Sequence, residues 1–212
     1  MYTLFGQPGW GSVLVETQLV FYRLPYRLEE VGDLLHSAEA RAKLTALNPL
    51  AQTPTLLLPD GRAMTESAAI TLHLADITGA TTLVPGPHEA ERVAFLRWLV
   101  FMVANIYPTF TYADIPDRFV PAECAKAFRT NVNAYAHRLW AQMEGEAAAP
   151  WFLGERFTAI DIFIATMTRW RPQRPWFAAN RPRLHAIAER TEAHPDLAPT
   201  WRRNFPNPPP DP

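Results

Sequence analysis

Residues 48–67 constrain the fold of this chain more than any other stretch. Pro54 comes directly before the apolar run at residues 55–58, and a proline cannot donate a hydrogen bond to a sheet, so it must lie at the start or edge of a strand. The Pro-Asp-Gly that follows is typical of a turn, and residues 62–65 are therefore predicted to pair with residues 55–58 as a hairpin. The helical apolar spacing of residues 68–75 then predicts a helix, with side-chain oxygens at its start. Free peptide groups and oxygens are expected to gather around one concavity.

The N-terminal segment is predicted to form a βαβ unit. A short strand at residues 2–5 leads into a loop rich in glycine and proline. Ser12 is a favourable N-cap for a helix at residues 13–23, in which Glu16 falls where the helix dipole favours a negative charge. Residues 26–31 are predicted to be a second strand, which a helical crossover makes parallel to the first.

A further helix and the hairpin complete the first predicted domain. Ser37 is expected to cap a helix that reaches about Leu47, because the Asn-Pro that follows disfavours the α conformation. The resulting order, βαβαββα, is that of a thioredoxin-like domain at residues 1–79.

The remainder of the chain is predicted to be helical. Residues 80–88 contain two prolines and a glycine without periodicity and are predicted to be a linker, and residues 89–203 are predicted to be an all-helical domain. Its first helix, residues 89–105, is apolar around most of its surface and is expected to be buried on nearly all sides. Pro121 is expected at the first position of the next helix. The proline-rich tail, residues 204–212, is predicted to be extended or disordered. The predicted fold class is α/β plus all-α.

Composition excludes several classes of function. The chain has 212 residues, a formal net charge of −1 and one cysteine, Cys124. This charge gives no general attraction to nucleic acid or to a membrane surface. A single cysteine excludes an internal disulfide and a Cys-x-x-Cys redox pair, and it fits a cytoplasmic setting. No signal-like start and no apolar run of about 18 residues are found, and the six histidines lack metal-ligand spacing. We therefore expect a soluble protein without a metal.

Two motifs resemble those of one family. Residues 48–56, Asn-Pro-Leu-Ala-Gln-Thr-Pro-Thr-Leu, followed by Glu66-Ser67, resemble the glutathione-site signature of the cytosolic glutathione transferases. Thr158 and Asp161, predicted to form a capping box at a helix start, resemble the structural box of that family's helical domain. The resemblance implies that Pro54 is cis and that the backbone of Thr53 pairs with the cysteinyl part of glutathione. It also implies that Glu66 and Ser67 hold the γ-glutamyl end and that the protein is a homodimer. Gln52 is a candidate to hold a terminal carboxylate. Two alternatives stay open: Glu66 and Ser67 only cap the helix, and Gln52 is an ordinary loop residue.

The start of the first helix is the candidate for activation of the glutathione thiol. A thiol with a pKa of about 8.5 is mostly protonated at neutral pH, so the protein must stabilise the thiolate. Ser12 is the first candidate catalytic residue, because a helix N-terminus offers free amides, a positive dipole and a hydroxyl. Two alternatives stay open: Ser12 is only a helix cap, or backbone amides around Trp10, Gly11 and Ser12 hold the sulfur. Phe5 and Gly11 stand about where other members of the family carry a tyrosine or a cysteine.

The second substrate and the reaction are less constrained. Tyr107, Phe110 and Tyr112, together with Trp10, are candidates to line an apolar site for an electrophile, although such aromatic residues are more often part of a core or an interface. The resemblance implies a detoxifying glutathione transferase. Two alternatives remain: a non-catalytic dimer that serves as a binding module, and a glutathione-dependent peroxidase or disulfide reductase.

Overall fold

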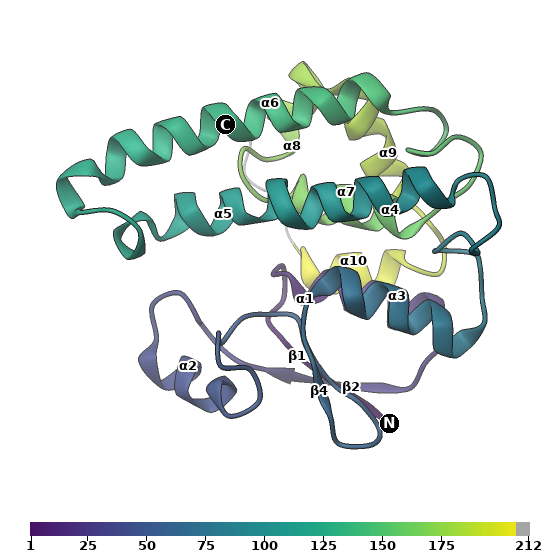
Figure 1. Cartoon of the computed structure of the whole chain (residues 1–212), viewed down its shortest axis with the longest axis horizontal. Coiled ribbons are helices and arrows are strands. Elements are labelled where there is room, and N and C mark those ends of the chain that lie inside the picture. Colours follow the sequence, from purple (N-terminus) through teal and green to yellow (C-terminus); the bar gives the residue numbers. More distant parts are fainter. Residues whose placement is uncertain (207–212) are drawn as a thin grey trace. The chain divides into compact units, whose positions relative to one another are not determined.

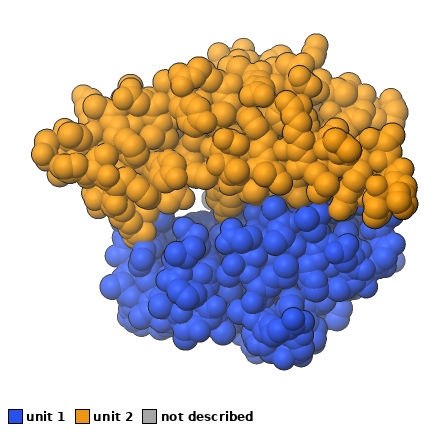
Figure 2. All heavy atoms as spheres, in the orientation of Figure 1, with its two compact units in different colours: residues 1–84, 190–212 blue, residues 85–189 orange. Residues whose placement is uncertain are grey.

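The computed structural model describes residues 1–206, and these residues form two compact units (Figures 1 and 2). Unit 1 comprises residues 1–84 together with the chain from residue 190 onward, and unit 2 comprises residues 85–189. The sequence-based division, with a linker at residues 80–88 and a helical domain ending at residue 203, differs from this arrangement at the C-terminus. The reason is that helix α10 (Ala198–Asn204) packs against the first helix of unit 1. The predicted tail begins inside α10, and its residues 207–212 lie outside the described residues.

Unit 1 is built on a four-stranded mixed sheet. Strands β1 (Tyr2–Gly6) and β2 (Tyr26–Glu30) are parallel, as the predicted βαβ unit requires. Strand β3 (Thr55–Leu57) runs antiparallel to β1, and β4 (Ala63–Met64) runs antiparallel to β3, which confirms the predicted hairpin. The strand order is β2-β1-β3-β4.

Helices cover both faces of this sheet. Helices α1 (Ser12–Phe21) and α3 (Ser67–Thr78) share a buried core with Leu4, whereas α2 (Ala38–Thr45) belongs to a separate cluster that Phe5 contacts. Successive side chains of a strand point to opposite faces, so α1 and α3 lie on one face and α2 lies on the other. Ser37 caps α2 by accepting a hydrogen bond from the Ala40 amide. The thioredoxin-like order βαβαββα is confirmed.

Unit 2 is helical, and its first long helix differs from the prediction. Helices α4 (Arg92–Phe101) and α5 (Tyr107–Asp114) are joined by a π-helical turn, η1 (Met102–Ile106). The expectation that this helix is buried on nearly all sides is wrong, because Val93 is 79% and Val100 55% exposed. Phe95, Leu99 and Met102 are fully buried, so only one stripe of the helix faces the core.

Together α4, η1 and α5 form one long, apolar helix of 23 residues. By length and composition, Arg92–Asp114 could cross a bilayer, with a mean hydropathy of 1.4. The core helix of a soluble protein satisfies the same criteria, and the buried stripe on α4 and η1 is that of a core helix.

The other helices of unit 2 follow through short turns. Two 3₁₀ turns, η2 (Pro116–Arg118) and η3 (Ala122–Cys124), lead into α6 (Ala125–Glu146). Pro121 therefore precedes a 3₁₀ turn and is not the first residue of an α-helix, as was predicted. The remaining helices are α7 (Ala159–Met167), α8 (Arg174–Asn180) and α9 (Pro182–Glu192), the last of which crosses the boundary between the units.

The predicted capping box lies at the start of α7. Both halves of the box formed by Thr158 and Asp161 are present. Within the box the Asp161 carboxylate accepts from the Thr158 amide at 2.7 Å, and it also accepts from the amide of Phe152 at 2.8 Å. Burial raises the pKa of Asp161 to about 6, although these donors oppose the shift. The carboxylate therefore joins the start of α7 to the preceding loop.

Candidate functional site

The sheet topology brings three loops of unit 1 to the same edge. Phe5, at the end of β1, pairs with Thr55, at the start of the antiparallel strand β3. Leu56 in turn pairs with Met64, at the end of β4. The end of β1, the start of β3 and the end of β4 are therefore neighbours. Three segments that carry the predicted site residues adjoin these strand ends: residues 7–12, 52–54 and 65–67.

The Ser12 hydroxyl is held by the loop that precedes it. Ser12 is the first residue of α1 and not its N-cap, a position taken by Gly11. Its Oγ donates a hydrogen bond to the carbonyl of Gln7 at 3.1 Å and accepts one from the Gln7 amide at 3.2 Å, and the residue is only 2% exposed. A Cβ at Gly6 would overlap the Ser12 side chain, so this close approach requires glycine. The hydroxyl thus closes the loop.

Main-chain amides are left available at the start of α1. The amide of Val13 donates to the Trp10 carbonyl, and that of Leu14 donates to Gly11. Within residues 1–206, the amides of Gly11 and Ser12 have no acceptor. A helix N-terminus with two free amides and a positive dipole end is suited to an anion.

Trp10 packs against the second core cluster of unit 1. It is half-buried and lies against the cluster formed by Leu34, Ala40, Leu44 and Ala51. Its side chain therefore fixes the loop to the α2 side of the sheet.

Asn48 holds the loop that leads to Pro54. Its Nδ2 donates to the carbonyl of Gln52 and to the hydroxyl of Thr55, both at 3.0 Å, and the Thr55 hydroxyl donates to the same Gln52 carbonyl at 2.8 Å. Asn48 is 4% exposed and Thr55 is fully buried. The Thr53–Pro54 bond is cis, as the resemblance implied. The sequence analysis placed Asn48 and Thr55 in the motif but did not identify them as the side chains that hold this loop. The signal that could have found them is a pair of polar residues flanking a predicted strand start.

The third segment begins α3. Glu66, its N-cap, has φ 66° and ψ 101°, an unusual conformation for a residue with a side chain, and it is exposed. Ser67 is 5% exposed, and its carbonyl accepts from the Thr71 hydroxyl, which in turn accepts from Gln18 on α1. In the described part of the chain, the amides of Ser67 and Ala68 have no acceptor. A second helix N-terminus suited to an anion therefore lies at the same edge.

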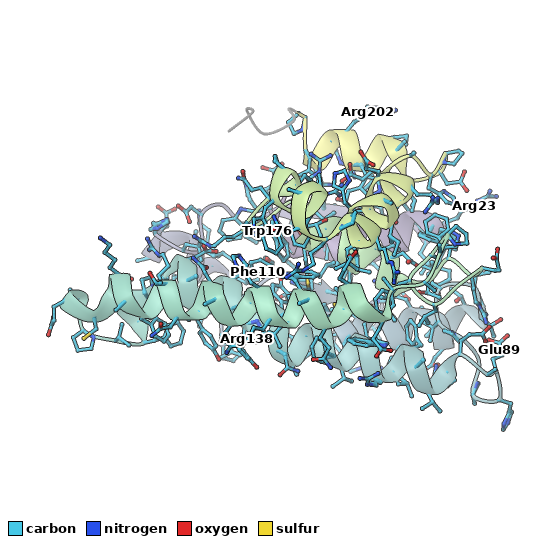
Figure 3. All side chains as sticks on the ribbon, turned by 90° about the horizontal axis from the view of Figure 1, so that it is seen from above. Arg23, Glu89, Phe110, Arg138, Trp176 and Arg202 are labelled. Carbon is cyan, nitrogen blue, oxygen red and sulfur yellow. The ribbon has the colours of Figure 1, made fainter. Side chains whose placement is uncertain are left out.

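The predicted aromatic residues of unit 2 fall into two clusters. Tyr107 stacks on Trp170 at 5.4 Å between ring centroids, and Phe110, marked in Figure 3, meets the same indole edge-on at 4.9 Å. Tyr112 instead contacts Phe119 and Phe128. The structure therefore brings together two of the three predicted residues and adds Trp170, which the sequence analysis did not select.

Among residues 1–206, no group of three or more His, Cys, Asp or Glu side chains could hold a metal ion.

Comparisons with known proteins agree with this geometry. Residues 17–77 match the family model described as glutathione S-transferase, N-terminal domain. An uncharacterised GST-like protein, YncG of Escherichia coli K12, is 38% identical over 205 residues, which is 96% of this chain and 98% of the relative. The glutathione S-transferase GstA of Escherichia coli O157:H7 is 28% identical over 79% of this chain and 81% of its own.

Solved structures show the same fold. A glutathione transferase homologue from Sulfitobacter, solved with bound glutathione, superposes with a TM-score of 0.84 and 21% identity, over 94% of this chain and 96% of that one. The extended match to YncG, the matched N-terminal domain and the shared fold lead to one conclusion. The chain is a member of the bacterial glutathione S-transferase superfamily.

Proposed function

We propose that this protein binds glutathione at the edge of the unit 1 sheet and stabilises its thiolate through the main-chain amides of Gly11 and Ser12, for attack on an apolar electrophile. The observation that carries the proposal is the hydrogen bonding of the Ser12 hydroxyl. It is bound in both directions to Gln7, whereas the two adjacent amides are free of protein acceptors. The role first given to the Ser12 side chain is thus proposed for its backbone.

The tripeptide has groups that match each segment. The γ-glutamyl carboxylate is suited to the free amides of Ser67 and Ala68, and its ammonium is suited to the exposed carboxylate of Glu66. The backbone of Thr53, beside the cis proline, would pair with the cysteinyl residue, and Gln52 would contact the terminal carboxylate. Held in this way, the sulfur is directed to the start of α1.

Stabilisation of the thiolate supplies the chemistry. Amides that donate to an anion form charge-assisted hydrogen bonds, and the helix dipole adds to them, so the thiol pKa falls below its free value of about 8.5. A larger fraction of bound glutathione is then nucleophilic at neutral pH. The sulfur forms a bond to the electrophilic carbon, and the leaving group departs with its electron pair or, in an addition, the product takes up a proton.

The electrophile and the assembly are part of the same proposal. The cluster of Tyr107, Phe110 and Trp170 supplies an apolar, aromatic surface for the second substrate. The exposed Val93 and Val100 on α4 support a homodimer, since they would be covered by a second subunit. A detoxifying role in the cytoplasm is part of the same proposal.

A non-catalytic binding module is the second candidate. It is favoured by one observation, namely that the site offers neither a phenol nor a thiol at the positions of Phe5 and Gly11. Such a protein would keep the tripeptide contacts without lowering the thiol pKa.

Calorimetry separates these candidates. Wild-type protein is titrated with glutathione and with γ-Glu-Ala-Gly, which lacks the sulfur. We expect both to bind, with glutathione gaining affinity as the pH rises through the depressed thiol pKa. Equal affinities at every pH would support the binding module, and the absence of heat at millimolar glutathione would refute both. Turnover of an aryl halide, compared with a peroxide and a mixed disulfide, then distinguishes conjugation from the reductive chemistries.

A further inference from the structure

A buried carboxylate lies on α1, four residues after Ser12. Glu16, in the middle of α1, is 1% exposed. Its Oε1 accepts hydrogen bonds from the Tyr26 hydroxyl, at 2.9 Å, and from Nη2 of Arg203, at 2.5 Å, and its Oε2 accepts from Nδ2 of Asn204, at 2.7 Å. A buried charge is costly unless it is paired and hydrogen-bonded, and here both oxygens are satisfied. The sequence analysis had assigned Glu16 only a favourable position in the helix dipole.

The partners of Glu16 respond to its charge. Partial burial alone would lower the pKa of Arg203, but the charge of Glu16 outweighs this effect and raises it. Burial, and secondarily Glu16, raises the pKa of Tyr26 to about 12. Both partners therefore keep their protons at neutral pH, and the network holds one negative and one positive charge.

Asn204 connects this network to the loop before α1. It is 5% exposed, and its Nδ2 donates to Glu16 and to the Thr200 carbonyl, while its Oδ1 accepts from the Gly9 amide at 3.3 Å. Gly9 has φ 77°, which favours glycine, and a Cβ there would lie 3.3 Å from the Asn204 carbonyl and 3.5 Å from the Phe205 ring. The C-terminal segment thus fits closely against this loop.

The loop is consequently held at two points. Gln7 is fixed by the Ser12 hydroxyl, and its side-chain Oε1 accepts from the Gly32 amide at 3.2 Å. Gly9 is fixed by Asn204. Gly11, whose free amide is proposed to hold the sulfur, lies two residues beyond Gly9, so the orientation of that amide depends on both attachments.

We propose that Arg203 and Asn204 of α10 are positioning residues for glutathione activation. Both hold Glu16, and Asn204 also holds Gly9. These contacts preorganise the amides of Gly11 and Ser12 for the thiolate. This inference rests on the proposed function. Arg203 also has an electrostatic role, because Glu16 lies about one helical turn from Ser12. An uncompensated carboxylate at that distance would oppose a thiolate at the helix start, and the guanidinium offsets it.

The chain provides a matched control on the same helix. Arg202 is exposed, and in the described part of the chain it has no ion-pair partner (Figure 3). Arg203→Met and Arg202→Met remove the same charge from adjacent positions, and only the first leaves Glu16 without a cation. Asn204→Ala removes the bonds to Gly9 and to Oε2 of Glu16, and it leaves the Glu16–Arg203 pair in place.

The experiment measures the ionisation of bound glutathione from the thiolate absorbance near 240 nm as a function of pH. We expect Arg203→Met to raise the thiol pKa by about one unit, estimated from one uncompensated charge at short range, and Arg202→Met to leave it unchanged. Affinity for γ-Glu-Ala-Gly should be unchanged in both variants, because the binding segments are intact. Arg203→Lys should keep the thiol pKa close to the wild-type value, because a cation still faces Glu16. Glu16→Gln combined with Arg203→Met should do the same, because the carboxylate charge is removed as well. A merely structural role of Arg203 would not produce this pattern.

A measurement without glutathione tests the attachment of the loop separately from the proposed function. Amide hydrogen exchange at Gly9 in the free protein should be faster in Asn204→Ala by about tenfold, corresponding to the loss of its hydrogen bond to Asn204, than in wild type or Arg202→Met. Unchanged exchange in Asn204→Ala, or equal thiol pKa values in the Arg203→Met and Arg202→Met variants, would overturn the inference. If wild-type protein fails to bind glutathione while exchange responds as expected, the proposed function fails and the attachment of the loop by α10 stands.

Discussion

Replacement of Ser12 by alanine tests whether the thiolate is held by a side chain or by the backbone. In the structure, the Ser12 hydroxyl donates to the Gln7 carbonyl and accepts from the Gln7 amide. The Gln7 carbonyl also accepts from the Trp10 amide at 3.0 Å, so it keeps a donor in the variant, whereas the Gln7 amide loses its acceptor. We therefore expect Ser12→Ala to weaken the loop without removing a donor to sulfur.

The two hypotheses differ in magnitude. A lost neutral hydrogen bond contributes about 1 kcal/mol, and an unsatisfied buried donor costs about 1–3 kcal/mol, so we expect a loss of about 2 kcal/mol in the free energy of unfolding. In a protein of this size, that loss lowers Tm by about 4–8 °C. If the hydroxyl were instead the main donor to the developing anion, its removal would cost about 3–4 kcal/mol in activation free energy, a loss of about 10² to 10³ in kcat.

The assay combines thermal unfolding with the pH dependence of thiolate absorbance and of kcat/KM. We expect a lower Tm and a thiol pKa within about half a unit of the wild-type value. Ser67→Ala is the matched control, since it removes a buried hydroxyl at the start of the other helix, keeps the main-chain amides and should leave the thiol pKa unaltered. A return of the thiol pKa to about 8.5 in Ser12→Ala, with Tm unchanged, would refute the reasoning and restore the hydroxyl as the activating group.

Three further predictions concern the supports of the site and of the helical unit. Gly6→Ala should destabilise the protein by about 3 kcal/mol in urea unfolding, because the new methyl group overlaps Ser12; a change below about 1 kcal/mol would show that the strand relaxes easily. Asn48→Ala should weaken glutathione binding about tenfold in calorimetry, since the Gln52 carbonyl and the loop to Pro54 lose their anchor; unchanged affinity would contradict this role. The raised pKa of Asp161 means that the folded state binds the Asp161 proton more tightly than the unfolded state does. The contribution of Asp161 to the free energy of unfolding is therefore greatest below about pH 4. It falls by up to about 3 kcal/mol as the pH rises to about 6. The difference between wild type and Asp161→Asn, measured by urea unfolding at pH 4, 5, 6 and 7, isolates this contribution from other carboxylates, and a difference independent of pH would contradict it.

The parts of the fold that the sequence predicted correctly depend on short-range signals. Pro54 marked a strand start, and the Pro-Asp-Gly after β3 marked its turn. Ser37 and the pair Thr158 and Asp161 marked helix starts, because the bonds of a cap join residues three positions apart. In each case the residues that decide the local structure are close in sequence.

The parts that were missed depend on long-range contacts. The C-terminal segment belongs to unit 1 because Asn204 meets Glu16 and Gly9 across most of the chain, a contact that no local pattern indicates. Ser12 matched the pattern of a helix cap. In the structure, however, its hydroxyl makes both of its hydrogen bonds with the backbone of Gln7, which directly follows β1. The exposure of Val93 was missed because an apolar residue on a long helix does not reveal whether another surface covers it.

A thiol site made of backbone amides, as we propose, changes which substitutions should matter. Amides are supplied by every residue except proline, so side-chain identity at the contact positions is weakly constrained, and Phe5 and Gly11 can stand where a phenol or thiol would otherwise be required. The geometry of those amides instead depends on residues that fix the backbone: Gly6 by close approach, Gly9 by its positive φ, and Asn204 by its hydrogen bond. Loss of function should therefore arise mainly from positions that never touch the substrate. This is the opposite of what is expected of an enzyme whose nucleophile is activated by one tyrosine, serine or cysteine side chain.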